Sequence, residues 1–200
     1  MPRGVAIPEL RQQLFSATER VIVRDGPGGL TGRALTREAG VATGLLYAHF
    51  ADMDDFLAAY AVDRAFQISA AAAALPGRAG TRTVAANLTG ALTSTPPATL
   101  AALARLMAAR PGLTGRVRAV LGDRTAGLEA VESAAAAYLE AEQRLGRVRA
   151  AADPGSLALA LVGAVHHLVL SDTAEPAARA RIGRLVAALT ADAATPEHHR

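Results

Sequence analysis

The sequence contains no cysteine and no lysine, and only 4% of its 200 residues are aromatic. The absence of cysteine excludes disulfide scaffolds, thiolate zinc sites and cysteine nucleophiles. All 21 basic residues are arginine, so little titrates between histidine and tyrosine, and the pI of about 10.1 reflects the missing lysines. The formal net charge is only +3. Charge alone therefore indicates a mildly basic protein.

Long hydrophobic runs are also absent. The most apolar stretch, residues 157–170, contains His166 and His167 and is shorter than the roughly 20 apolar residues that a bilayer requires. The first residues combine proline, glutamate and arginine and lack the apolar run of a signal peptide. We therefore expect a cytoplasmic protein without a membrane partner.

Alanine, leucine, arginine and glutamate recur at helical spacing, and no stretch shows the period-two alternation of a surface strand. Glycine, proline and N-cap residues divide this pattern into segments. The sequence thus predicts an all-α protein of about nine helices without a fixed-period repeat. The helices are expected near residues 8–24, 31–39, 43–49, 52–75, 81–93, 98–110, 113–121, 123–147, 154–171 and 176–191.

Residues 31–50 predict two helices of about two turns, joined at Gly40. Such a pair forms a helix-turn-helix, whose second helix enters the major groove while the first crosses the phosphate backbone. The residues that can pack inward are Ala34, Leu35, Ala39, Val41, Leu46 and Phe50. The residues left for the outer face of the second helix are Thr43, Gly44, Leu45, Tyr47 and His49.

This segment resembles the TetR/AcrR family of bacterial transcriptional regulators. The resemblance rests on Leu30-Thr31, residues 33–39, Gly40-Val41 and above all Leu46-Tyr47 followed by His49-Phe50. The motif covers about 20 residues, whereas the expected helical layout agrees over nearly the whole chain. The resemblance implies an N-terminal three-helix DNA-binding domain, residues 1–51, and a helical ligand-binding and dimerisation domain, residues 52–200.

The resemblance also implies contacts with double-stranded operator DNA. Phosphate contacts are implied for Thr31, Tyr47 and His49, and base-edge contacts for Thr43, Gly44 and Leu45. Arg33 matches a position that reaches a base or a phosphate, and Arg37 lies on the same helix face. An arginine can pair with guanine and a leucine can touch a thymine methyl. We therefore favour Arg33, Thr43 and Leu45 as the residues that read the DNA sequence.

The chain departs from the family pattern in two places. Ala42 stands where members commonly have a serine or threonine that caps the recognition helix, and Thr43 can take over that role. Residues 51–53 lack the lysine that members often carry there. Residues 1–50 hold six arginines and four acids, a net charge of only +2. We expect few ionic phosphate contacts and a shallow salt dependence of DNA binding.

Each of these residues also has a plainer interpretation. Tyr47 can be a half-buried aromatic and His49 an exposed polar side chain. Arg33 and Arg37 can solvate a helix face or pair with Glu38 or another acidic neighbour. The joint spacing favours DNA binding over these separate interpretations.

The family resemblance implies a small-molecule ligand for the C-terminal region. The candidate ligand contacts are Phe66, Asn87, Met107, Tyr138 and His166, although each can instead belong to the core. The scarcity of aromatic residues favours an apolar ligand with few polar groups. His166 and His167 point about 100° apart on a helix and cannot chelate one metal together. No metal or cofactor is expected.

A homodimer is implied through the last two long helices, residues 154–171 and 176–191. The candidate interface residues are Ala160, Gly163, His167, Ile182, Leu185 and Leu189. A two-fold dimer reads two half-sites about one DNA turn apart, or a multiple of it. The sequence leaves open which of His166 and His167 faces a pocket.

No glycine-rich phosphate loop, nucleophile elbow, metal cluster or acid–base pair indicates an enzyme. We therefore expect a ligand-responsive regulator, a repressor that its ligand releases from a palindromic operator. The alternative is a dimeric interaction or small-molecule-binding protein of the same fold that does not bind operator DNA. The ligand, the operator and the sign of regulation stay open.

Overall fold

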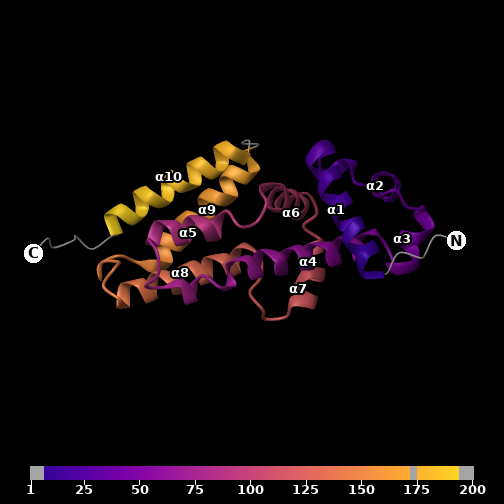
Figure 1. Ribbon diagram of the computed structural model, residues 1–200. Helices are drawn as coiled ribbons and strands as arrows, with labels where there is room; N and C mark the ends of the chain where they lie inside the picture. Colours follow the sequence, from indigo (N-terminus) through magenta and orange to yellow (C-terminus); the bar gives the residue numbers. More distant parts are fainter. Residues whose placement is uncertain (1–6, 172–174, 194–200) are drawn as a thin grey trace, which may run out of the picture. The chain divides into compact units, whose positions relative to one another are not determined.

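In the computed structural model, residues 7–171 and 175–193 are described, and these residues form helices and no strand (Figure 1). The all-α class is thereby confirmed, and the ten α-helices in the described residues correspond to the ten expected ranges. The helices are α1 Ile7–Asp25, α2 Gly32–Ala39, α3 Thr43–His49, α4 Met53–Ala73, α5 Val84–Leu92, α6 Pro97–Ala109, α7 Leu113–Leu121, α8 Leu128–Arg144, α9 Pro154–Leu170 and α10 Glu175–Ala193, with short 3-10 turns η1 Pro27–Gly29 and η2 Pro76–Arg78.

The chain divides into two compact units. The first contains the described residues up to Arg64 together with Ala98–Asp123, and the second contains Ala65–Pro97 and the described residues from Arg124 onward. Helix α4 contributes residues to both units, and α6 and α7 belong with the N-terminal helices. These compact units differ from the functional division after residue 51, which stays a prediction.

Aromatic rings form the centre of the first unit. The ring centroid of Phe56 lies 5.6 Å from that of Phe15 and 5.0 Å from that of Phe50, and Phe15 lies 5.7 Å from Tyr60. Tilted and edge-on aromatic contacts add about 0.5–1.5 kcal/mol each to the burial of the rings. Because Phe50 follows α3 directly, this cluster ties the end of α3 to α1 and α4.

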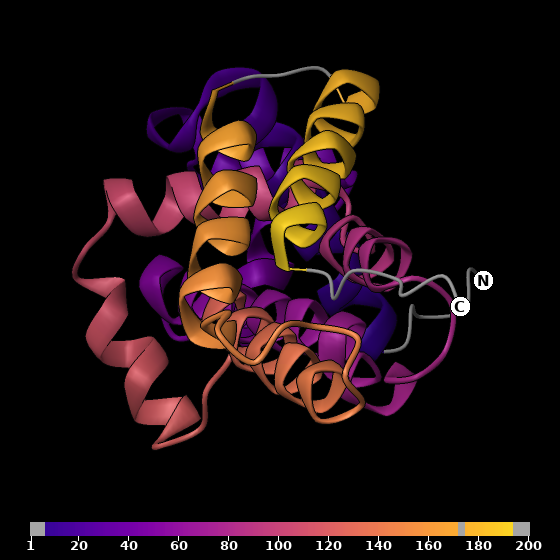
Figure 2. The same cartoon turned by 90° about the vertical axis from the view of Figure 1, so that its left-hand side faces the viewer.

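In the second unit, α8 packs against α5 and α9, and α10 packs against α5 and α9. Helices α9 and α10 lie side by side in both views (Figures 1 and 2). Their buried side chains include Leu161, Val165 and Leu168 of α9 and Ile182 and Val186 of α10. Within the described residues, no helix is long and apolar enough to cross a membrane, α9 included.

Two helices of the second unit begin later than the sequence pattern predicts. Helix α8 is expected from residue 123 but begins at Leu128, after Gly127 with a φ of 67°. The N–H of Gly127 donates to Ser69 Oγ at 2.9 Å, a contact that turns the chain before the helix starts. Helix α5 begins after Thr83, whose side chain caps it, because Arg82 has a positive φ of 44°.

Candidate nucleic-acid interface

The ends of α2 follow from its own sequence. Thr31 Oγ1 accepts a hydrogen bond from the N–H of Ala34 at 3.1 Å and caps the first turn. Gly40 follows the helix with a φ of 69°, a left-handed conformation that favours glycine. The N–H of Val41 then donates to the carbonyl of Thr36 at 3.0 Å. These contacts give a tight turn into α3.

The inner face of the helix-turn-helix is the one that the sequence predicts. Leu35, Ala39, Leu46 and Phe50 are all buried in the core that α1 and α4 share with them. Val41 is half-buried and packs against the same core. The inward interpretation is therefore confirmed for these five residues, whereas Ala34, the sixth member of the predicted set, is only half-buried.

All eight residues for which DNA contacts are expected are exposed: Thr31, Arg33, Arg37, Thr43, Gly44, Leu45, Tyr47 and His49. The exposed fraction is 38% for Leu45 and 51% for Tyr47. With about half of its surface covered, Tyr47 also fits its plainer interpretation as a half-buried aromatic. Exposed large apolar side chains on a compact motif are typical of a binding surface, and contact with DNA stays a prediction.

The start of α3 differs from the expectation. Ala42 occupies the N-cap position and no side chain caps the helix, so the expected transfer of the cap to Thr43 is wrong. Thr43 Oγ1 instead lies 3.0 Å from Thr36 Oγ1. Thr36 is 1% exposed and is hydrogen-bonded within α2, so it holds the Thr43 hydroxyl away from the free amides of the first turn.

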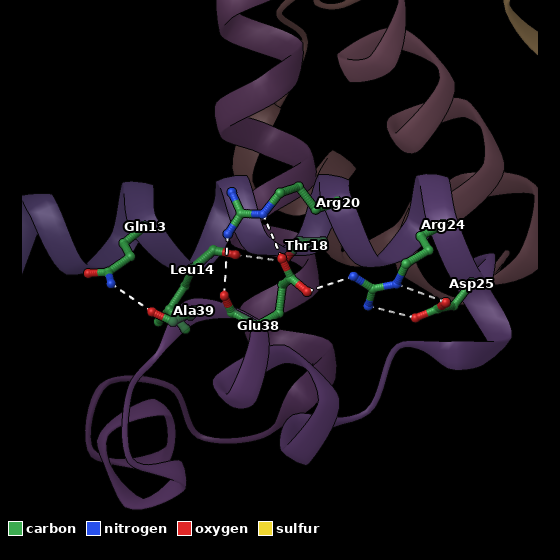
Figure 3. A network of polar contacts seen from close by, with 8 residues as sticks. All are labelled: Gln13, Leu14, Thr18, Arg20, Arg24, Asp25, Glu38 and Ala39. Carbon is green, nitrogen blue, oxygen red and sulfur yellow. Dashed lines mark hydrogen bonds and ion pairs between the residues drawn. The ribbon is translucent and has the colours of Figure 1, made fainter.

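An ion-pair network joins α1 to α2 (Figure 3). Glu38 accepts hydrogen bonds from Arg20 Nε and from Arg24 Nη1, both at 2.7 Å, and Arg24 also pairs with Asp25 at 2.8 Å. The hydrogen bond from Arg20 is the largest cause, and the one from Arg24 the next, that holds the pKa of the Glu38 carboxyl below its usual range. Glu38 is therefore engaged by α1, and the interpretation in which it pairs with Arg33 or Arg37 has no support.

The acids that follow the motif are also paired within the first unit. Asp54 lies 3.2 Å from Arg110, and Asp52 lies 3.6 Å from Arg116. Asp52 Oδ1 also accepts from the N–H of Asp55 at 2.6 Å and caps α4, as its position before that helix predicts. These arginines offset part of the negative charge that the sequence places directly behind the motif.

In the second unit, two of the candidate ligand residues form one polar cluster. Asn87 Nδ2 donates to Tyr138 Oη at 3.1 Å and to the carbonyl of Thr81 at 2.8 Å, while Asn87 Oδ1 is buried without a partner. Burial is the main cause, and a hydrogen bond with Glu142 the second, that raises the pKa of Tyr138 to about 12. Arg147 lies 3.3 Å from Glu142, so a buried carboxylate and its counter-ion belong to the same cluster.

The other candidate ligand residues lie elsewhere. Phe66 is partly exposed, and the guanidinium of Arg124 lies 5.3 Å from its ring centroid. Met107 packs against the core of the first unit. His166 is exposed on α9. The structure thus brings Asn87 and Tyr138 together, and ligand contact stays a prediction for all five residues.

The candidate dimer residues separate into exposed and buried groups. Ala160, Gly163 and His167 of α9 are exposed, and His167 accepts a hydrogen bond from Ser171 Oγ on its carbonyl at 2.7 Å. Leu185 and Leu189 of α10 are half-buried, whereas Ile182 is buried within the unit. Leu159, 59% exposed, and Leu170, 41% exposed, also stand on α9 and were not among the candidates. Their i, i+11 spacing was the signal that could have found them.

Thr36 and Gly32 are the residues of the motif that sequence reasoning missed. Thr36 contacts Thr43, and a Cβ on Gly32 would meet the side chain of Tyr47. A polar residue at an inward-facing position of α2 was the available signal for Thr36. No local pattern indicates Gly32.

Comparison with known proteins identifies the motif. Residues 14–60 match the family described as "Bacterial regulatory proteins, tetR family". An uncharacterized HTH-type transcriptional regulator of Haemophilus influenzae is 40% identical over 53 residues, which span 26% of this chain and 28% of that relative. The sequence similarity to that relative is thus confined to a stretch of the size of one small domain.

Solved structures extend the likeness of fold over most of the chain. A TetR-family transcriptional regulator from Rhodococcus sp. has a TM-score of 0.63 at 22% identity, over 92% of this chain and 100% of that one. FadR from Bacillus subtilis in complex with stearoyl-CoA has a TM-score of 0.63 at 15% identity, over 90% and 97%. Residues 14–60 thus match the helix-turn-helix domain of the tetR family of bacterial regulatory proteins, and the fold over most of the chain is similar to that of solved TetR-family regulators.

Proposed function

We propose that this chain is a transcriptional regulator whose α2 and α3 bind double-stranded operator DNA. The observation that carries this proposal is the exposure of all eight expected DNA residues on a motif whose apolar residues are buried. Thr31, Tyr47 and His49 contact phosphates, and Thr43, Gly44 and Leu45 lie towards the base edges. Arg33 reaches a base or a phosphate, with Arg37 on the same helix face. Phosphate contacts position the protein and base contacts specify the sequence.

The distribution of arginines and acids in the first unit supports few ionic contacts with the DNA phosphate backbone. Arg20 and Arg24 are engaged by Glu38 and so have less charge to offer a phosphate. Hydroxyl groups and helix-terminal amides then supply much of the positioning. We expect a salt dependence that is shallower than that of a lysine-rich relative, because few counterions are released.

The regulator acts as a homodimer through α9 and α10. Leu159 and Leu170 of α9 are exposed, and Gly163 between them lets another helix approach closely. Burial of the part of each leucine that is still exposed contributes about 1 kcal/mol. A two-fold arrangement presents one helix-turn-helix to each half of a palindromic operator.

A small, mainly apolar ligand releases this repressor from its operator. The FadR structure from Bacillus subtilis, which holds stearoyl-CoA, supports the binding of an apolar acyl chain by a fold of this kind. Helix α4 runs on from the residues behind the motif into the second unit, so it is the element through which ligand binding acts. The ligand shifts the equilibrium only through its differential affinity for the bound and released arrangements.

Fluorescence anisotropy with the intergenic DNA beside the chain's own gene tests DNA binding. The wild-type chain is expected to bind selectively, and Tyr47→Phe combined with Leu45→Ala is expected to weaken binding at least tenfold without loss of helicity. Stearoyl-CoA, whose acyl chain is apolar although its coenzyme A part is charged, serves as the probe for release. If neither that DNA nor a selected duplex is bound selectively, the chain is instead an interaction or ligand-binding protein of this fold.

Sedimentation velocity tests the dimer. Leu159→Glu is expected to shift the chain towards the monomer, because it would place two charges in a buried interface. Leu145→Glu is the matched control, since Leu145 is similarly exposed, at 56%, but does not lie on α9 or α10. Equal effects of the two substitutions would refute the proposed interface.

A further inference from the structure

Thr36 links the two helices of the motif through its hydroxyl group. Its Oγ1 lies 2.8 Å from the carbonyl oxygen of Gly32 and 3.0 Å from Oγ1 of Thr43. Thr36 is buried, whereas Thr43 is exposed at the first position of α3. One buried hydroxyl therefore touches both a backbone carbonyl and a side chain expected to face the bases.

The number of protons sets the direction of these two hydrogen bonds. A carbonyl oxygen carries no proton, so only the Thr36 proton can lie between Thr36 Oγ1 and the Gly32 oxygen. The second contact must then use the proton of Thr43. The reverse assignment would leave two oxygen atoms 2.8 Å apart with no hydrogen between them. Thr43 therefore donates to Thr36.

This direction decides what Thr43 presents outside the protein. Its only hydroxyl proton points inward, so lone pairs of Oγ1 and the γ-methyl remain for a partner. In the major groove, the amino groups of adenine (N6) and cytosine (N4) are donors, whereas guanine and thymine present acceptors at the corresponding atoms. A threonine that can only accept a hydrogen bond therefore matches adenine or cytosine, and it does not match guanine or thymine.

We propose that Thr36 is a specificity-determining residue, which makes Thr43 select an adenine or a cytosine at the base that Thr43 contacts. This inference rests on the proposed function, since it requires α3 to lie in the major groove. It concerns hydrogen-bond direction, which neither the motif nor the exposure of Thr43 determines.

The Thr36 hydroxyl is not needed to satisfy the backbone of α2. The Gly32 carbonyl lies at the position that accepts the helical hydrogen bond from the N–H of Thr36. A threonine that bonds back to the preceding turn is neutral to slightly unfavourable for a helix. Valine has nearly the same shape, so Thr36→Val is expected to leave α2 folded while removing the acceptor for Thr43.

The first test identifies the base that faces Thr43. The full chain is used to select sites from randomised duplexes, and every base of the selected site is then substituted in turn. The position at which Thr43→Val loses discrimination is expected to hold adenine or cytosine. Replacing that base by an analogue without the exocyclic amino group is expected to weaken wild-type binding about threefold to tenfold and to leave Thr43→Val unaffected.

The second test changes Thr36 itself. In Thr36→Val the Thr43 proton is released, so guanine or thymine is expected to be tolerated within about twofold of the original base. Thr36→Ser keeps the hydroxyl and is expected to keep the preference. Guanine or thymine opposite Thr43 in the wild-type site, or an unchanged preference in a folded Thr36→Val, would overturn the inference. Loss of all selective binding by the wild-type chain would overturn the proposed function as well.

Discussion

The hydroxyl oxygen of Tyr47 in α3 lies 2.6 Å from the position that a Cβ of Gly32 would occupy in the first turn of α2. The ring carbon Cζ of Tyr47 lies 3.4 Å from the same position. A side chain larger than hydrogen at residue 32 therefore cannot coexist with this placement of Tyr47. Glycine, although unfavourable within a helix, lets an exposed aromatic of one helix lie against the start of the other.

Gly32→Ala is expected to displace the Tyr47 hydroxyl and to weaken operator binding about tenfold, the effect of losing a hydrogen bond to a charged phosphate. In a Tyr47→Phe background the same substitution is expected to have little effect, because the oxygen that meets the new methyl group is gone. Fluorescence anisotropy on the four variants of this cycle measures the coupling. Equal losses in both backgrounds would contradict a role through Tyr47.

Gly115→Ala is the matched control for this substitution. Gly115 lies inside α7, and a Cβ there meets nothing within 4 Å. Alanine is expected to stabilise the chain by roughly 0.5–1 kcal/mol through helix propensity, with no change in operator affinity. Urea unfolding checks the gain in stability, and the same anisotropy assay checks the affinity.

Glu38→Gln is expected to make the chain less stable at neutral pH than the wild type. The arginines of α1 hold the pKa of Glu38 below its ordinary value of 4.5, so its stabilisation is complete above that pH and is lost as the pH falls. The difference in urea unfolding midpoint between the wild type and Glu38→Gln should therefore decrease towards zero as the pH falls below about 4. A difference that persists unchanged to pH 3 would refute this account.

Glu19→Ala is expected to destabilise the first unit by about 2–3 kcal/mol. Arg64 is 4% exposed, pairs with Glu19 at 2.5 Å and with Asp63 at 2.6 Å, and lies 5.5 Å from the ring centroid of Tyr60. Loss of one carboxylate leaves a buried cation with incomplete compensation. Chemical unfolding measures the effect, with the exposed Glu140→Ala as a control expected to change stability by less than about 0.5 kcal/mol.

Alkaline titration should separate the buried tyrosines. Burial raises the pKa of Tyr138 to about 12 and also raises the pKa of Tyr60 above its usual range. Because both values are raised, their stabilisation is complete below pH 10 and is lost as the pH rises towards 12. Ultraviolet absorbance is expected to show tyrosine ionisation that occurs well above pH 10. The amplitude of this high-pH change is expected to be smaller in Tyr138→Phe. Ionisation of all three tyrosines near pH 10 in the folded chain would contradict this.

Local sequence accounts for most of the helix ends in the motif. Thr31 caps α2 and Gly40 ends it, as neighbouring residues alone predict, because capping involves groups only a few positions apart. The start of α8 could not be found in the same way. Gly127 turns the chain there because its N–H reaches Ser69, which is distant in sequence.

The helical class, the apolar inner face and the family motif all depend on the spacing of residues along the chain. They can therefore be predicted from contiguous sequence. The contacts that give the outer face its chemistry are different in kind. Thr36 with Thr43, Gly32 with Tyr47 and Glu38 with Arg20 each join residues of separate helices. Such pairs exist only after the helices have packed, since packing sets which side chains come within hydrogen-bond distance and which way a proton points.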